Sequence, residues 1–160
     1  MVCLNFRAAP HLIRVSCSPD PFYQSSGELD SLRVPLIEPY EAIKIDDSGW
    51  FIELDSDNLN EFFYNGINGA SKIAIMENRI YVYSDYERLD GINIELKKFH
   101  WFVLNTVSNT EIAFEAEEEF VQYQLDNRYE DPQWITIDDA FKEFETTGCL
   151  AWVPGCEKIE

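Results

Sequence analysis

Short segments of alternating apolar and polar residues, joined by tight turns, dominate the middle of the chain. Residues 42–46 and 50–54 alternate with period two on either side of the turn Asp47-Ser48-Gly49. Residues 72–76 and 79–83 do the same around the shorter turn Glu77-Asn78. Successive side chains of a strand point to opposite faces, so each pair of segments predicts a β-hairpin.

Three other segments have the spacing and the end signals of helices. Residues 117–128 begin with three glutamates, which complement the positive end of a helix dipole. A second helix is predicted from Thr136 to Gly148, because Thr136 and Asp139 have the spacing of a capping box and a glycine commonly ends a helix. A third is predicted after the N-cap candidates of residues 55–58, with apolar residues at helical spacing: Leu59, Phe62, Phe63 and Ile67.

The remaining segments are less regular. Residues 91–104 fit a strand in their first half and a helix in their second half, whereas residues 112–116 alternate as a strand. Residues 1–33 are rich in prolines and polar turns and are predicted to form an extended N-terminal arm, followed by a single domain over residues 34–160. The mixed order of hairpins and helices predicts an α+β fold, with a mostly antiparallel sheet and about three helices packed on it.

Composition adds a large negative charge to this picture. The 160 residues hold 30 Asp and Glu against 12 Lys and Arg, a net charge of -18. The chain should nevertheless fold, because 46% of its residues are hydrophobic and 14% are aromatic. The charge argues against nucleic acid and anionic membranes as partners, since both are bound through Lys and Arg. No apolar run is long enough to span a membrane.

The cysteines give no sign of a metal site or a redox motif. They lie near the two ends of the chain, at Cys3, Cys17, Cys149 and Cys156, and no Cys-x-x-Cys pair occurs. Cys149 and Cys156 could bridge in an oxidising compartment, but we expect free thiols. The N-terminus lacks the uninterrupted apolar core of a signal peptide, which predicts a cytoplasmic protein.

Candidate catalytic groups are few. Asp85 precedes Glu95 and Lys97 at a spacing that permits a metal-dependent nuclease centre, in which carboxylates hold a divalent cation. His100 stands between Phe99 and Trp101, surroundings more typical of a half-buried structural histidine than of a general acid or base. No nucleophile elbow, phosphate-binding glycine loop or zinc-binding histidine pair occurs. We therefore expect a protein without enzymatic activity, cofactor or bound metal.

The strongest feature of the sequence is a concentration of acids toward its C-terminal end. Residues 111–145 hold 12 acids and two bases, a net charge of -10, with aromatic residues interleaved. This pattern fits either a solubilising surface over an aromatic core or a docking surface for a basic protein. For a docking surface, the candidate partner-binding residues are Glu115, Glu117, Glu118, Glu119, Asp126, Tyr129, Glu130, Asp131, Asp138 and Asp139, with Tyr129 near the centre.

In size, acidity and predicted fold, the chain resembles the small immunity proteins of bacterial toxin systems, including contact-dependent inhibition. The resemblance implies an inhibitor that neutralises a basic partner, such as a nuclease toxin domain, with carboxylates in place of phosphates. One alternative is a DNA mimic that inhibits a defence protein, which would need carboxylates spaced along an elongated face. The other alternative is the metal-dependent enzyme that uses Asp85, Glu95 and Lys97.

Overall fold

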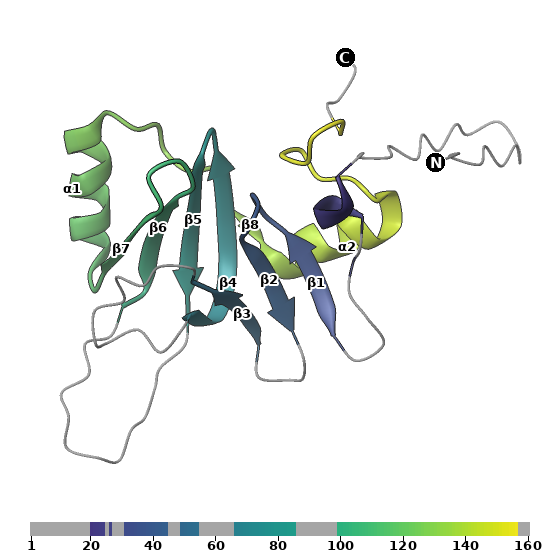
Figure 1. The fold of residues 1–160 in the computed structure, drawn as a ribbon. Helices are drawn as coiled ribbons and strands as arrows, with labels where there is room; N and C mark the ends of the chain where they lie inside the picture. Colours follow the sequence, from purple (N-terminus) through teal and green to yellow (C-terminus); the bar gives the residue numbers. More distant parts are fainter. Residues whose placement is uncertain are drawn as a thin grey trace, which may run out of the picture.

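The computed structural model describes residues 20–24, 26, 31–44, 49–54, 66–85 and 99–156. The described helices are the short 3-10 helix η1 (Pro21–Tyr23) and the α-helices α1 (Glu117–Asn127) and α2 (Ile137–Thr147). The strands are β1 (Leu32–Pro35), β2 (Glu41–Lys44), β3 (Trp50–Glu53), β4 (Gly66–Met76), β5 (Arg79–Ser84), β6 (Trp101–Asn105), β7 (Thr110–Phe114) and β8 (Ile135–Thr136). The α+β class is therefore confirmed (Figure 1).

The strands form one antiparallel sheet in which neighbours along the chain pair with each other. The order is β1-β2-β3-β4-β5-β6-β7. The short strand β8 pairs with Lys72 and Ile73 of β4, on the same edge of β4 that pairs with β3 closer to its start. Both predicted hairpins are confirmed: Ala42 pairs with Ile52, and Met76 pairs with Arg79 across the two-residue turn. The predicted strand over residues 112–116 is confirmed as β7, which pairs with β6.

The long strand β4 corrects one prediction. Ile67 does not belong to a helix; it lies in β4, is buried, and pairs with Ile52 of β3. Gly66, which precedes it, pairs with Glu53 so closely that an added Cβ would collide with the ring of Phe51. The rest of the predicted helix falls on residues 55–65, outside the described part of the chain.

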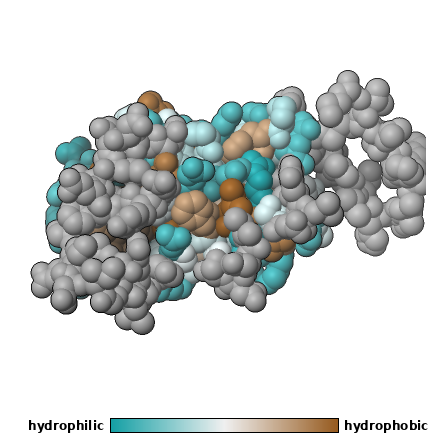
Figure 2. Space-filling view, turned by 60° about the horizontal axis from the view of Figure 1, so that its bottom comes forward, coloured by the Kyte–Doolittle hydropathy of each residue, from teal (hydrophilic) through white to brown (hydrophobic). Residues whose placement is uncertain are grey.

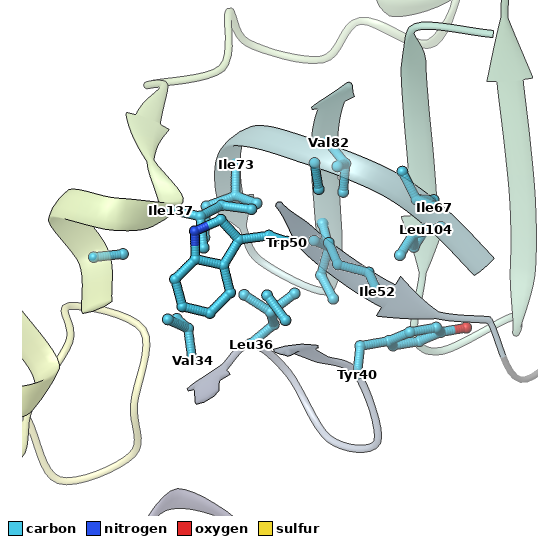
Figure 3. Close-up of a cluster of buried hydrophobic side chains, with 14 of the residues drawn as sticks. Val34, Leu36, Tyr40, Trp50, Ile52, Ile67, Ile73, Val82, Leu104 and Ile137 are labelled. Atoms are coloured by element: carbon cyan, nitrogen blue, oxygen red, sulfur yellow. The ribbon is translucent and has the colours of Figure 1, made fainter. Parts of the chain in front are cut away.

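Both faces of the sheet are covered by apolar side chains. The larger core cluster lies on the α2 side and contains Val34, Trp50, Ile52 and Ile73 (Figure 3). Ala140 and Phe144 of α2 belong to the same cluster. The smaller cluster lies on the α1 side and is formed by Ala74, Tyr81, Val103 and Phe120. Ile73 and Ala74 are neighbours in β4 but belong to different clusters, as the period of two requires. The two helices thus cover opposite sides of the sheet (Figure 1).

Each of the two described α-helices follows its sequence signals. Thr136 caps α2: its hydroxyl accepts a hydrogen bond from the amide of Asp139 at 3.1 Å, and Gly148 ends the helix with a φ of 67°. α1 opens with Glu117, Glu118 and Glu119 and ends at Arg128, whose φ is 56°. The prediction of about three helices is not matched, since the described residues contain two α-helices.

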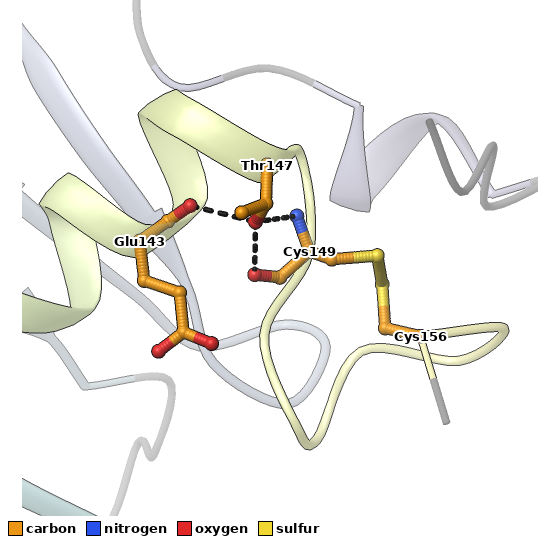
Figure 4. Close-up of a disulfide and its surroundings, with 4 residues drawn as sticks. All are labelled: Glu143, Thr147, Cys149 and Cys156. Atoms are coloured by element: carbon orange, nitrogen blue, oxygen red, sulfur yellow. Dashed lines mark hydrogen bonds between the residues drawn. A yellow bond between two sulfur atoms is a disulfide. The ribbon is translucent and has the colours of Figure 1, made fainter. Parts of the chain in front are cut away.

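The C-terminal segment contains a disulfide that the sequence did not lead us to expect. Cys149 and Cys156 are bonded, with their Cα atoms 5.4 Å apart, so the expectation of free thiols is wrong for this pair (Figure 4). The hydroxyl of Thr147 accepts from the amide of Cys149 at 3.0 Å and lies within donating distance of two carbonyl oxygens, of which its single hydrogen serves one at a time. The disulfide loop is thus tied to the end of α2.

The predicted N-terminal arm is described only in part. Within it, η1 places Tyr23 in the larger core cluster, where 7% of the side chain is exposed. β1 begins at Leu32, and the amide of Arg33 donates to the carbonyl of Ser26 at 2.7 Å. No helix among the described residues has the length and apolarity needed to cross a membrane.

Candidate partner-binding surface

The outer face of α1 combines acids with exposed apolar residues. Because consecutive residues of a helix are 100° apart, Phe120, Tyr123 and Gln124 face the sheet while the opposite side faces outward. The outward side is formed by Glu117, Glu118, Val121, Gln122, Leu125 and Asp126, and we call this set the α1 surface. Residues 117–131 carry six acids and one base, a net charge of -5.

Two apolar residues on the α1 surface point into solvent. Val121 is 42% exposed and Leu125 is 65% exposed, and the two lie four residues apart, on the same side of the helix. Single exposed apolar side chains are normal, and the view in Figure 2 shows several among hydrophilic ones. An adjacent apolar pair framed by carboxylates has the arrangement of an interface, with an apolar centre and a polar rim.

The carboxylates around this stripe are available to a partner. Neither Glu117 nor Glu118 nor Glu119 forms an ion pair with another residue of the described chain, and the same holds for Glu130 and Asp131. Asp126 accepts a hydrogen bond from the amide of Gln122 at 2.7 Å, a neutral donor that leaves its charge uncompensated. Glu115 precedes the helix and is exposed, and it is not counted among these carboxylates.

Tyr129 occupies a different environment from the one its acidic neighbours suggest. Its ring lies beneath the guanidinium of Arg79, with the Cζ atom 4.0 Å from the ring centroid. The ring of Tyr123 lies 6.0 Å away, edge-on. Arg79 also donates from Nε to the hydroxyl of Tyr81 at 3.1 Å and from Nη2 to Glu77 at 2.6 Å. Tyr129 therefore joins the loop after α1 to the β4–β5 hairpin, and its half-buried ring is less accessible than Leu125.

Burial governs the titration of the tyrosines in this cluster. Desolvation raises the pKa of Tyr81, although the hydrogen bond from Arg79 opposes the rise. Desolvation also raises the pKa of Tyr123, and the neighbouring Tyr129 adds to the effect. The hydroxyls of Tyr81 and Tyr123 therefore stay protonated at neutral pH and add no negative charge.

The last two candidate residues, Asp138 and Asp139, lie in the first turn of α2, on the other side of the sheet from α1. Asp138 accepts a hydrogen bond from the indole of Trp50 at 2.9 Å, with Lys44 4.0 Å away. Asp139 accepts from the hydroxyl of Thr136 at 2.6 Å. These contacts give both carboxylates local structural roles, and the structure does not bring them together with the α1 surface.

The alternative catalytic groups are placed only in part. Asp85 is exposed at the end of β5, while Glu95 and Lys97 lie outside the described part of the chain. Within the described ranges, no three His, Cys, Asp or Glu side chains cluster as a metal site would require. His100 is half-buried, as predicted: its Nδ1 lies 2.8 Å from the carbonyl of Ser84, and its ring packs edge-on to Trp101.

Sequence reasoning named the acids of this surface but missed its apolar centre. Val121 and Leu125 are four residues apart, and Asp126 follows Leu125 directly, a pattern that is visible once the sheet-facing side of the helix is fixed by Phe120. The role of Arg79 had no local signal, because its contact with Tyr129 joins distant parts of the chain. Comparison with known proteins finds no matching family model, no matching curated protein and no matching solved structure.

Proposed function

We propose that this protein binds a basic protein partner through the α1 surface and acts as an inhibitor of that partner, as immunity proteins do. The observation that carries the proposal is the exposed pair Val121 and Leu125, framed by carboxylates without ion-pair partners in the described chain. The inhibitory role rests on the resemblance in size, acidity and fold class. The partner's identity follows from chemistry alone: a protein surface rich in Lys and Arg.

The carboxylates and the apolar residues of the α1 surface would contribute differently to binding. Unpaired carboxylates attract a cationic surface over a distance of about 10 Å at moderate salt, which raises the association rate. An apolar side chain that becomes buried at the centre of an interface lowers the dissociation rate. Leu125, which is the more exposed of the pair, is therefore the expected anchor, and Glu118 and Asp126 are the expected steering charges.

The same observations favour a protein partner over the DNA-mimic alternative. A mimic presents carboxylates spaced like phosphates to a groove that binds nucleic acid, and apolar side chains have no counterpart on a phosphate backbone. On α1 the apolar residues Val121 and Leu125 occupy the middle of the outward face, with acids on both sides. An interface with an apolar centre and a charged rim is the arrangement that protein partners use.

The test is capture of a partner by the full chain from a lysate of the source organism, followed by titration of the purified partner. Leu125→Ser should leave folding and the rate of association with the partner unchanged. It should raise Kd at least about tenfold through faster dissociation. Glu118→Lys and Asp126→Lys should lower the association rate, and more so at low salt. Glu145→Lys, an exposed acid on α2, is the matched control for the charge change.

The inhibitory role is tested on the same purified partner. Its own activity, for example hydrolysis of RNA or DNA if it is a nuclease, should fall in a one-to-one ratio with added protein. Leu125→Ser should require a higher concentration for the same inhibition. Equal affinity of Leu125→Ser, Glu118→Lys and the unaltered protein would show that the α1 surface is only a solubilising face.

A further inference from the structure

A pocket of about 390 Å³ lies outside the α1 surface, at the end of the β4–β5 hairpin. Its walls come from four separate segments of the chain: η1, the β1–β2 connection, the β4–β5 hairpin and the disulfide loop. The residues that matter here are Tyr23, Ile37, Ile75, Trp152, Pro154 and Glu77. Five of these side chains are apolar or aromatic, and Glu77 is the one acid that lines the pocket.

The disulfide loop holds its side of the pocket in place by several independent contacts. Trp152 donates from its indole nitrogen to the carbonyl of Pro35 at 3.0 Å, which ties the loop to β1. Leu150 and Val153 are buried in the larger core cluster, and the Cys149–Cys156 bond closes the loop around them. On the facing wall, the hydroxyl of Tyr23 accepts from the amide of Glu38 at 3.3 Å. The pocket is thus built by buried anchors and not by a loose surface loop.

Glu77 gives the pocket its chemical preference. One of its carboxylate oxygens, Oε2, accepts from Arg79 at 2.6 Å, and the other oxygen has no hydrogen-bond partner in the described part of the chain. The side chain is 74% exposed, so its second oxygen remains accessible to a ligand although Arg79 pairs with the first. A single available oxygen suits the point charge of an ammonium group better than the two-pronged guanidinium of arginine. An apolar pocket that ends at this oxygen fits a long methylene chain with an ammonium head.

We propose that this pocket receives a lysine side chain of the basic partner, with its methylene groups against Trp152 and Ile75 and its ammonium at Glu77. The proposal rests on the proposed function and extends it to a second contact point. The link between the two is structural: Glu77 holds Arg79, and Arg79 lies over Tyr129, which follows α1. A partner that covers the C-terminal end of α1 would therefore meet this hairpin next.

The pocket can be tested without the partner, by titrating the full-length protein with Nα-acetyl-lysine methylamide and following amide and indole signals by NMR. The probe should shift the indole N–H signal of Trp152, which is assigned by its loss in Trp152→Phe. The norleucine analogue, which has the same chain length without the ammonium, should bind about threefold more weakly, since a pair with an exposed carboxylate contributes little more than that. The arginine analogue should also bind more weakly than the lysine probe.

Two variants locate the site. Ala151, which also lines the pocket, is exposed, so Ala151→Leu should fill the space without disturbing the core and should abolish the shifts. Glu77→Gln should reduce the affinity for the lysine probe to that for norleucine, while Glu53→Gln, the same change at an exposed position on β3, should leave it unaltered. Equal affinities for the lysine and norleucine probes, shifts that persist in Ala151→Leu, or no saturable shift would each overturn the proposal.

The pocket and the α1 surface can fail separately. If the lysine probe does not bind but Leu125→Ser still lowers the affinity for the purified partner, the proposed function stands and the pocket has no part in it. If the probe binds as expected but Leu125→Ser and Glu118→Lys leave partner affinity unchanged, the α1 surface is not the docking site. Leu125→Ser should not alter probe binding, which makes it the internal control for both experiments.

Discussion

The guanidinium of Arg79 lies 4.0 Å from the centre of the Tyr129 ring, and this contact joins the β4–β5 hairpin to the loop that follows α1. The same guanidinium donates to the hydroxyl of Tyr81, whose side chain has no exposed area, and to the carboxylate of Glu77. Arg79 therefore holds Tyr81 and Tyr129 on the α1 side of the sheet and Glu77 at the rim of the pocket. Its removal should affect both.

We expect Arg79→Met to lower the free energy of unfolding by roughly 1–3 kcal/mol, because it leaves the buried Tyr81 hydroxyl without its donor and removes the cation from the Tyr129 ring. The measurement is urea unfolding followed by far-UV circular dichroism. Arg128→Met is the matched control, since Arg128 is exposed and its substitution removes the same positive charge. An equal effect of the two substitutions would mean that the change in net charge, and not these contacts, causes the loss of unfolding free energy.

The side-chain nitrogen of Gln124 is buried without a hydrogen-bond partner among the described residues. The residue faces the sheet from α1 and is only 4% exposed. Gln124→Met keeps the length and helix propensity of the side chain while removing the polar group, so we expect a gain of about 1 kcal/mol in unfolding free energy. Gln122→Met on the outward face is the control, and it should lose the bond to Asp126 with little net change. A destabilised Gln124→Met would show that the amide has a partner.

The capping box of α2 should make stability depend on pH. The hydrogen bond from Thr136, together with that from Lys142, lowers the pKa of Asp139 below its ordinary value. A lowered pKa stabilises the folded state at pH values above the unfolded pKa, about 3.9, and this contribution is lost as the pH falls through the folded pKa. Asp139→Asn should therefore destabilise the protein at neutral pH but not in strong acid. The measurement is the urea midpoint across this range, and in a Thr136→Val background the pH-dependent difference should shrink.

The hairpins and α2 were predictable because their signals are local. Met76 and Arg79 face each other across two residues, so alternation and a tight turn suffice to define the pair. Thr136 and Gly148 mark the ends of α2 by chemistry that acts within one turn of the helix. The assignment of Ile67 to a helix failed because a few apolar residues can match helical spacing by coincidence, and pairing with Ile52 decides its conformation.

The parts that the sequence left unpredicted depend on contacts between distant segments. β1 contains Pro35 and β8 has two residues, so neither shows a period of two, and each exists through its pairing partner. For the candidate site, charge was readable from composition, whereas the outward direction of Leu125 needed the packing of Phe120 on the sheet. The acids at Asp138 and Asp139 looked alike in sequence to those of α1, yet their position in the fold separates them.

The disulfide should contribute measurably to stability. Cys149 and Cys156 are separated by seven positions, and closing a loop of this size in the unfolded chain corresponds to about 2 kcal/mol in the chain-entropy view. Cys149→Ser/Cys156→Ser should lose about this amount and should unfold at the same urea concentration as the reduced unaltered protein. Mass spectrometry of the unreduced peptide that holds both cysteines should give a mass two hydrogens lower than the reduced form. Free thiols at both positions in the native protein would contradict the bond, and the loop would then rely on Leu150 and Val153 alone for its attachment to the core.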